Sequence, residues 1–165
     1  MDRSALRRSA AAALLAVGSV TGVLALMPGS ASAAQIGTLA FTSLTTQDSP
    51  FSVTTSAGCP DTATNFQIKV TGGNIPATAG NIVGNTAGAT IASGINAGPF
   101  SVPVSNTLRV FATNNGLSAL ADGTYTTTLI CRGLLASASQ GDYVGTFVVS
   151  GGGAKVTPAV PSTST

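Results

Sequence analysis

Residues 122–131, Asp-Gly-Thr-Tyr-Thr-Thr-Thr-Leu-Ile-Cys, decide the fold class of this chain. The run from Tyr125 to Cys131 is rich in β-branched residues, which favour a strand, and the Asp-Gly pair before it is a turn signal. Similar short runs, with apolar and polar residues alternating between turn-forming clusters, recur at 39–42, 51–54, 66–70, 100–104 and 143–149. This spacing predicts an all-β sandwich rather than a parallel sheet.

Two segments break the alternation. Between residues 74 and 98, recurring glycines separate isolated apolar residues, which predicts one or two short strands joined by loops. From residue 108 onward the apolar residues follow helical spacing, with Ser105 or Asn106 as the N-cap and Gly116 at the end. The sequence therefore predicts one short helix just before the strand that ends at Cys131. Pro103 places the run 100–104 in an edge strand or at a strand end.

The first 33 residues have the order of a secretory signal peptide. A cluster of arginines precedes an apolar run, Ala10 to Leu26, and Ala31-Ser32-Ala33 then forms a small-residue cleavage site. The run is short for a membrane span and contains glycine, serine and threonine, so we expect cleavage after Ala33 and no transmembrane segment in the mature chain. The general secretory and twin-arginine export routes both stay open.

The chain accordingly divides into three expected parts. Residues 1–33 are the signal peptide, and residues 34–152 are the sandwich domain, which is long enough for one core. Residues 153–165 are rich in proline, threonine and serine and are expected to form a disordered tail. A chain carrying such a leader works outside the cytoplasm, where disulfides persist.

The charges of residues 34–165 cancel. The bases and acids are Lys69, Arg109, Arg132 and Lys155 against Asp48, Asp61, Asp122 and Asp142. The net charge of +2 therefore belongs to the leader. A neutral, sparsely charged domain offers no electrostatic surface for nucleic acid or for an anionic membrane.

The residue types needed for catalysis are scarce. The chain contains neither histidine nor glutamate, which removes the commonest general acids and bases, and its aspartates are scattered. Metal sites need clusters of histidine, cysteine or carboxylate that this sequence lacks. We therefore expect no catalytic residues, no metal site, no cofactor and no enzymatic activity. The phenylalanines are expected to fill the core rather than to line a ligand pocket.

Four strings, in this order, resemble immunoglobulin-like (Ig-like) domains of secreted and wall-attached surface proteins in high-GC Gram-positive bacteria. They are Phe66-Gln-Ile-Lys-Val-Thr-Gly72, Ile82-Val-Gly-Asn-Thr86, Val102-Pro-Val-Ser-Asn-Thr-Leu108 and Gly123-Thr-Tyr-Thr-Thr-Thr-Leu-Ile-Cys-Arg132. The resemblance implies an Ig-like β-sandwich and an extracellular location. In antibody domains the corner tyrosine stands two residues before the cysteine, whereas here it stands six before, and the chain has no tryptophan.

Within such a sandwich, the ends of the second and sixth strands lie at the same pole. Cys59 comes just after the second strand and Cys131 ends the sixth, so the resemblance implies one disulfide between them. It also implies that Tyr125 forms a tyrosine corner, with its hydroxyl bonded to the backbone near residues 116–122. Asp122 has a structural turn role.

The sequence predicts a secreted, non-catalytic Ig-like module of the cell surface or cell wall, with a structural or adhesive role. A cell-wall polymer and another surface protein are the partner classes it suggests, and it leaves open whether the chain is released or retained. The alternative is a small-ligand carrier resembling the secreted apoproteins that sequester antibiotic chromophores, which requires an open pocket between the sheets.

Overall fold

Eight strands, one short α-helix and one 3-10 turn make up the described part of the chain, residues 33–135 and 138–160 of a computed structural model. The predicted signal peptide lies outside these residues except for Ala33, and so does the end of the predicted tail, residues 161–165. All described residues belong to one unit of the chain. No helix among them is long and apolar enough to span a membrane.

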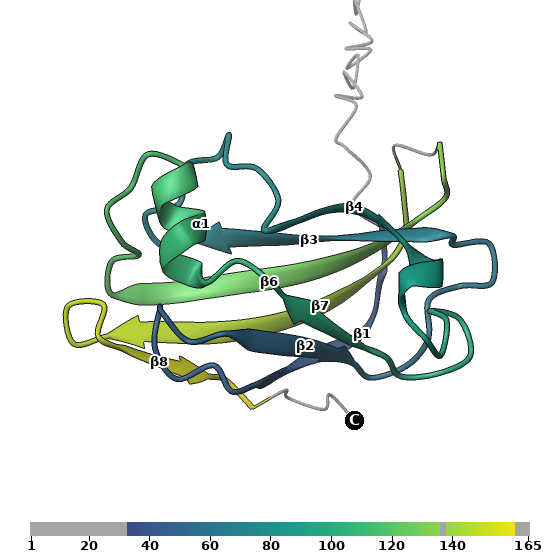
Figure 1. The fold of residues 1–165 in the computed structure, drawn as a ribbon, viewed down its shortest axis with the longest axis horizontal. Helices are drawn as coiled ribbons and strands as arrows, with labels where there is room; N and C mark the ends of the chain where they lie inside the picture. Colours follow the sequence, from purple (N-terminus) through teal and green to yellow (C-terminus); the bar gives the residue numbers. More distant parts are fainter. Residues whose placement is uncertain (1–32, 136–137, 161–165) are drawn as a thin grey trace, which may run out of the picture. The chain divides into compact units, whose positions relative to one another are not determined.

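Figure 1 labels the elements of the chain except β5 and η1. The strands are β1 (Gln35–Thr42), β2 (Phe51–Thr55), β3 (Asn65–Gly72), β4 (Val83–Ala87), β5 (Ser101–Val104), β6 (Gly123–Arg132), β7 (Ser139–Ser150) and β8 (Lys155–Pro158). Helix α1 spans Leu108–Asn114, and the 3-10 turn η1 spans Gly88–Thr90. Every alternating run of the sequence overlaps a strand, and the segment 74–98 contributes the one short strand β4. The prediction of a mainly β fold with one short helix is confirmed.

The strands form one bent sheet in the order β4-β3-β6-β7-β1-β2-β5. Strand β1 joins the two layers of this sheet. Its first half pairs in parallel with β7, through Gln35 to Thr38, and its second half pairs antiparallel with β2, through Leu39 to Thr42. Strands β4 and β5 stand at the two ends of the order, and each pairs with one described neighbour. The sheet is therefore continuous through β1, whereas its two end strands, β4 and β5, do not pair with each other.

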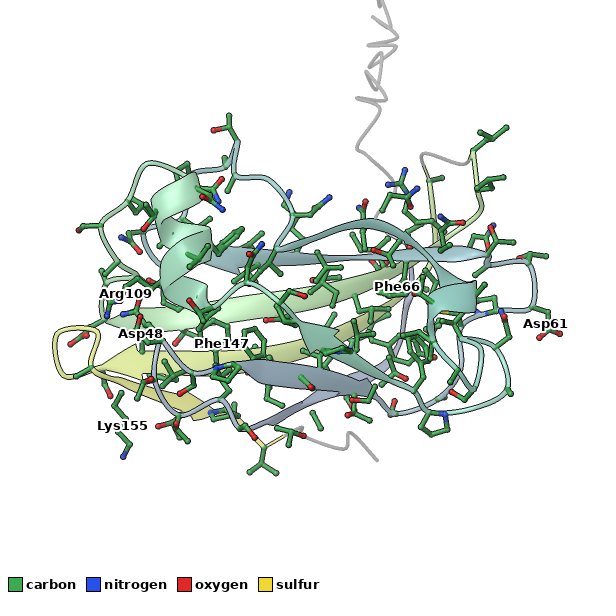
Figure 2. All side chains as sticks on the ribbon, viewed as in Figure 1. Asp48, Asp61, Phe66, Arg109, Phe147 and Lys155 are labelled. Carbon is green, nitrogen blue, oxygen red and sulfur yellow. A yellow bond between two sulfur atoms is a disulfide. The ribbon has the colours of Figure 1, made fainter. Side chains whose placement is uncertain are left out.

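Side chains alternate between the core and the outer face along the central strands. On β6, Tyr125, Thr127, Leu129 and Cys131 are buried, whereas the residues between them are partly exposed. The buried phenylalanines are Phe51, Phe66, Phe100, Phe111 and Phe147, and Phe41 packs against the same core. Figure 2 labels two of them, Phe66 and Phe147, inside the sandwich. The prediction that phenylalanines fill the core is confirmed, but Phe66 also lines a pocket, which the sequence did not predict.

The predicted disordered tail is wrong for its first residues. Residues 155–158 form β8, which pairs antiparallel with β7 from Phe147 to Ser150, and Val156 is buried in the core. The pairing is available because β1 leaves the edge of β7 after Val144 when it crosses to the other layer. The edge position also explains how Pro158, which has no N–H, is tolerated in a strand.

The predicted caps of the helix need a correction at the N-terminus. The N-cap is Thr107, whose Oγ1 accepts a hydrogen bond from the N–H of Val110, and not Ser105 or Asn106. At the other end Asn115 is the C-cap, and Gly116 follows with a φ of 79°, the left-handed conformation expected after a helix.

Thr127 offers a direct test of core energetics. Its side chain is fully buried, and its Oγ1 has no hydrogen-bond partner among the described residues. An unpaired buried hydroxyl is destabilising, and valine has nearly the same shape. We expect Thr127→Val to raise the free energy of unfolding by about 1 kcal/mol in urea titrations. The control is Thr126→Val, on the partly exposed face of the same strand, which should change the free energy of unfolding little. A loss of stability in Thr127→Val would show that the Thr127 hydroxyl is paired.

Candidate functional site

The two cysteines lie at the positions that the sequence predicts. Cys59 follows β2, Cys131 lies near the end of β6, and the two are disulfide-bonded with their Cα atoms 5.8 Å apart. Both are buried, and the described residues include no free cysteine. Next to the bridge, the Tyr143 hydroxyl donates a hydrogen bond to the carbonyl of Gly58. This pole of the sandwich is therefore held both covalently and by a buried tyrosine.

Tyr125 holds the opposite pole. Its side chain is fully buried and stacks on Phe147 with ring centroids 5.3 Å apart. Its hydroxyl lies 2.8 Å from the carbonyl oxygen of Ala121, to which it donates, and 2.8 Å from Oδ1 of Asn74. The bond expected between Tyr125 and the segment 116–122 is thus present, and it ties the connection after α1 to the loop between β3 and β4.

Removing this hydroxyl gives a clean test of the corner. Tyr125→Phe keeps the ring and its stacking but loses the hydrogen bond to Ala121, so we expect a loss of about 1 kcal/mol in the free energy of unfolding. Urea titration of both proteins measures it. Equal stability would mean that water replaces the hydroxyl without loss.

Asp122 fixes the turn between β7 and β8. Its Oδ1 accepts a hydrogen bond from the N–H of Gly153 at 2.8 Å, and its Oδ2 accepts from the N–H of Gly152 at 3.1 Å. The φ angles of Gly152 and Gly153 are positive, 68° and 87°, which glycine adopts without strain. These two hydrogen bonds connect the segment after α1 to the turn that leads into β8.

Both tyrosines of the chain give the fold a defined response to alkaline pH. Burial raises the pKa of Tyr125 and of Tyr143 above the ordinary value of 10.0. The unfolded chain therefore releases these protons at a lower pH than the folded chain, and stability falls as pH rises above about 10. We expect the melting temperature to drop from about pH 10 upward, with tyrosinate absorbance appearing together with unfolding. Tyrosinate absorbance in the still-folded protein near pH 10 would contradict this.

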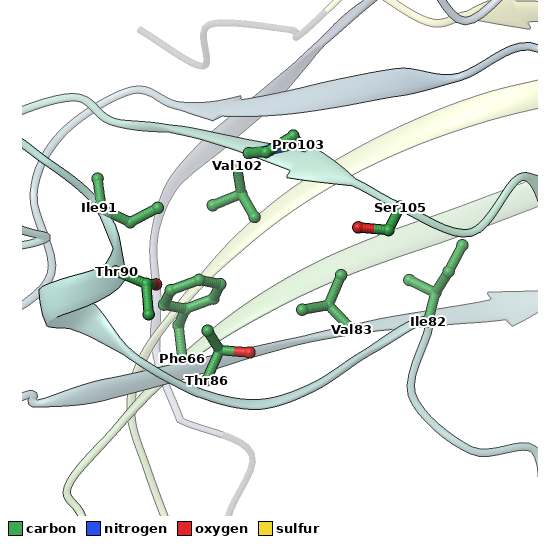
Figure 3. Close-up of a pocket in the computed structure, with 9 residues that line it drawn as sticks. All are labelled: Phe66, Ile82, Val83, Thr86, Thr90, Ile91, Val102, Pro103 and Ser105. Carbon is green, nitrogen blue, oxygen red and sulfur yellow. The ribbon is translucent and has the colours of Figure 1, made fainter.

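The open side of the sandwich contains a pocket of about 400 Å³, called here the β4–β5 pocket. It lies between the two end strands of the sheet, and Figure 3 shows Val102 of β5 facing Phe66 of β3 across it. Its apolar lining comes from Phe66, Ile82, Val83, Ile91, Val102 and Pro103. Hydroxyl-bearing residues complete it, namely Thr86, Thr90 and Ser105.

The pocket exists because β4 and β5 are not joined. Phe66, Ile82 and Val102 are buried and form its inner part, whereas Val83 and Ile91 are partly exposed at its edge. The Phe66 ring rests against that of Phe100, with centroids 6.1 Å apart, so the inner part is continuous with the core. No lining residue is charged. Such a pocket can take an uncharged, largely apolar group and can offer it hydroxyl groups at the rim.

No charged residue lines the β4–β5 pocket. Asp48 and Arg109 form an exposed ion pair of 2.6 Å near α1, and Asp61 lies at the opposite end of the domain (Figure 2). The hydrogen bond from Arg109 lowers the pKa of Asp48. Among the described residues, no group of three histidine, cysteine or acidic side chains is close enough to hold a metal ion.

Sequence reasoning missed the β4–β5 pocket. Its lining residues look like ordinary core residues of short strands, and they come from separate segments, 66, 82–91 and 102–105. These segments come together only because the strand order places β4 and β5 at the two ends of the sheet. Comparison of the chain with protein-family models, with curated proteins and with solved structures finds no match.

Proposed function

We propose that this chain is a secreted, non-catalytic Ig-like module of the cell surface or cell wall that binds its partner through the β4–β5 pocket. The observation that carries the proposal is the pocket itself, an uncharged apolar recess of about 400 Å³ on a disulfide-bonded sandwich. Pockets of this size and lining are typical binding sites. The scarcity of acid–base residues favours binding over catalysis.

The strand arrangement supports the Ig-like part of the proposal. The layer β4-β3-β6-β7 has the order of the C′, C, F and G strands of Ig domains, and β1-β2-β5 has the order of A, B and E. Helix α1 falls between the strands equivalent to E and F, and Tyr125 stands near the start of the F equivalent with its hydroxyl bonded four residues upstream, as in a tyrosine corner.

Location is the first test. Cells that make the full chain are separated into medium, wall and membrane fractions, and the protein is sequenced from its N-terminus and assayed for free thiols after denaturation without reductant. We expect it in the medium or wall, beginning at or within two residues of Ala34, without free thiols. A cytoplasmic protein with an intact N-terminus and two free thiols would overturn the proposal.

The carrier function is the second candidate, and the same pocket favours it. If the pocket holds a small apolar ligand, protein purified from its own culture should carry a compound that denaturation releases. The variant Val83→Asp, which places a charge at the edge of the pocket, should lose that compound, whereas Val110→Asp on the exposed face of α1 should retain it. Absorbance and mass spectrometry of the released fraction distinguish the outcomes.

A further inference from the structure

Two adjacent leucines project from the connection between β6 and β7. The side chains of Leu134 and Leu135 are 67% and 95% exposed, whereas the other strongly exposed large apolar residues of the described chain lie singly. Connections between strands normally carry polar and turn-forming residues. Single exposed apolar residues need no explanation, whereas contiguous exposed apolar surface is typical of contact sites. We call this pair the leucine knob.

The chain that leads into the leucine knob is anchored to the sandwich. Cys131, three residues before Leu134, is disulfide-bonded to Cys59. Between them, the carbonyl of Arg132 accepts a hydrogen bond from the N–H of Thr64, and its guanidinium donates to Oε1 of Gln67 at 2.6 Å. Because the chain that leads into the knob is already held in place, less conformational freedom is lost there on binding, which favours binding.

The β4–β5 pocket is complementary to the leucine knob in chemistry. The knob is apolar and uncharged, and the inner part of the pocket is formed by Phe66, Ile82 and Val102 without a charged group. The exposure of the leucines shows that they do not fill the pocket of their own copy. Because the charges of residues 34–165 cancel, two copies of the domain do not repel each other through net charge.

We propose that the leucine knob of one copy enters the β4–β5 pocket of the next, so that the protein associates with itself head to tail. The inference rests on the proposed binding role of the pocket and names the partner as a second copy of this chain. Knob and pocket are different surfaces, so the contact is heterologous and leaves one knob and one pocket unfilled in every dimer. The contact can therefore continue into a ring or a chain of copies. Its small area makes each contact weak, and association becomes appreciable where many copies are concentrated at one surface.

Two variants separate the halves of the contact. The knob variant, Leu134→Ser with Leu135→Ser, keeps the pocket, and the pocket variant, Ile91→Asp, places a charge at the partly exposed edge of the pocket and keeps the knob. Sedimentation velocity of the exported protein at concentrations up to about 1 mM measures association. We expect the wild type to form species larger than a dimer. Each variant alone should associate at least about 10-fold more weakly.

Mixing the two variants is the decisive measurement. The intact knob of the pocket variant fits the intact pocket of the knob variant, so the mixture should form a 1:1 dimer and nothing larger. The control Val110→Asp, on α1, should associate as the wild type does. Should Ile91→Asp melt at a lower temperature than the wild type, Thr90→Asp at the exposed rim serves in its place.

Three results would overturn the inference: a wild type that stays monomeric over this range, variants that associate like the wild type, or a mixture that associates no better than its parts. A monomeric wild type that releases a pocket-bound compound on denaturation would remove self-association and leave the binding role of the pocket intact. A pocket variant that behaves as the wild type in both assays would remove the binding role as well.

Discussion

Replacing Cys59 and Cys131 together with alanine is expected to lower the free energy of unfolding by about 2–5 kcal/mol. The bridge links residues 72 positions apart, and a loop of this length gives a chain-entropy estimate of about 4 kcal/mol. Both cysteines are buried, so the double variant also loses packing at this pole of the sandwich. The Tyr143 hydroxyl donates its hydrogen bond to the Gly58 carbonyl at the same pole. A loss of this size is a large share of the stability that a domain of this length usually has.

Urea titration of the wild type and the double variant, with and without reductant, measures this contribution. Reductant should destabilise the wild type and leave the double variant unchanged, which separates the covalent constraint from other effects. The β4–β5 pocket is lined by other residues, so any ligand binding should survive in the fraction that stays folded. A double variant as stable as the wild type would show that the bridge adds nothing to the fold.

The parts of the fold that could be predicted are those whose local pattern and long-range packing agree. Strands β3 and β6 each have one buried and one partly exposed face, so apolar and polar residues alternate along their sequences and indicate a strand directly. The disulfide could be predicted because the chain has two cysteines, and because the resemblance to Ig-like domains led us to expect an extracellular location and a strand order that brings the two cysteines together.

The parts that could not be predicted depend on pairings between distant segments. Strand β8 contains Pro158 and a single buried apolar residue, Val156, and becomes a strand because β1 leaves room at the edge of β7. The N-cap Thr107 follows two other residues of capping type, and the path of the chain after β5 decides among the three. The β4–β5 pocket likewise follows from the order of the strands, because no single segment contains it.

Gln47 is the clearest example of a residue whose role depends on contacts between distant segments. It lies in the loop between β1 and β2, where the sequence gives no reason to expect burial, yet its side chain is 1% exposed. Its Nε2 donates to the carbonyls of Leu120 and Gly153 at 2.9 and 2.8 Å, and its Oε1 accepts from the N–H of Leu120 at 2.7 Å. One side chain thus joins the β1–β2 loop, the segment after α1 and the β7–β8 turn.

Replacing Gln47 with leucine is expected to lower the free energy of unfolding by about 3–5 kcal/mol. Leucine fills similar space, so the loss arises from the buried N–H and carbonyl groups that Gln47 no longer pairs, and not from a cavity. Leu120 and Gly153 are both buried, and Gly153 lies against the Gln47 amide, so we expect the freed backbone groups to stay without a partner. The matched control is Gln35→Leu, since Gln35 is exposed and donates to one backbone carbonyl, and its effect should stay below about 0.5 kcal/mol. Equal losses in the two variants would mean that water satisfies these groups and that the three segments are held together by apolar packing alone.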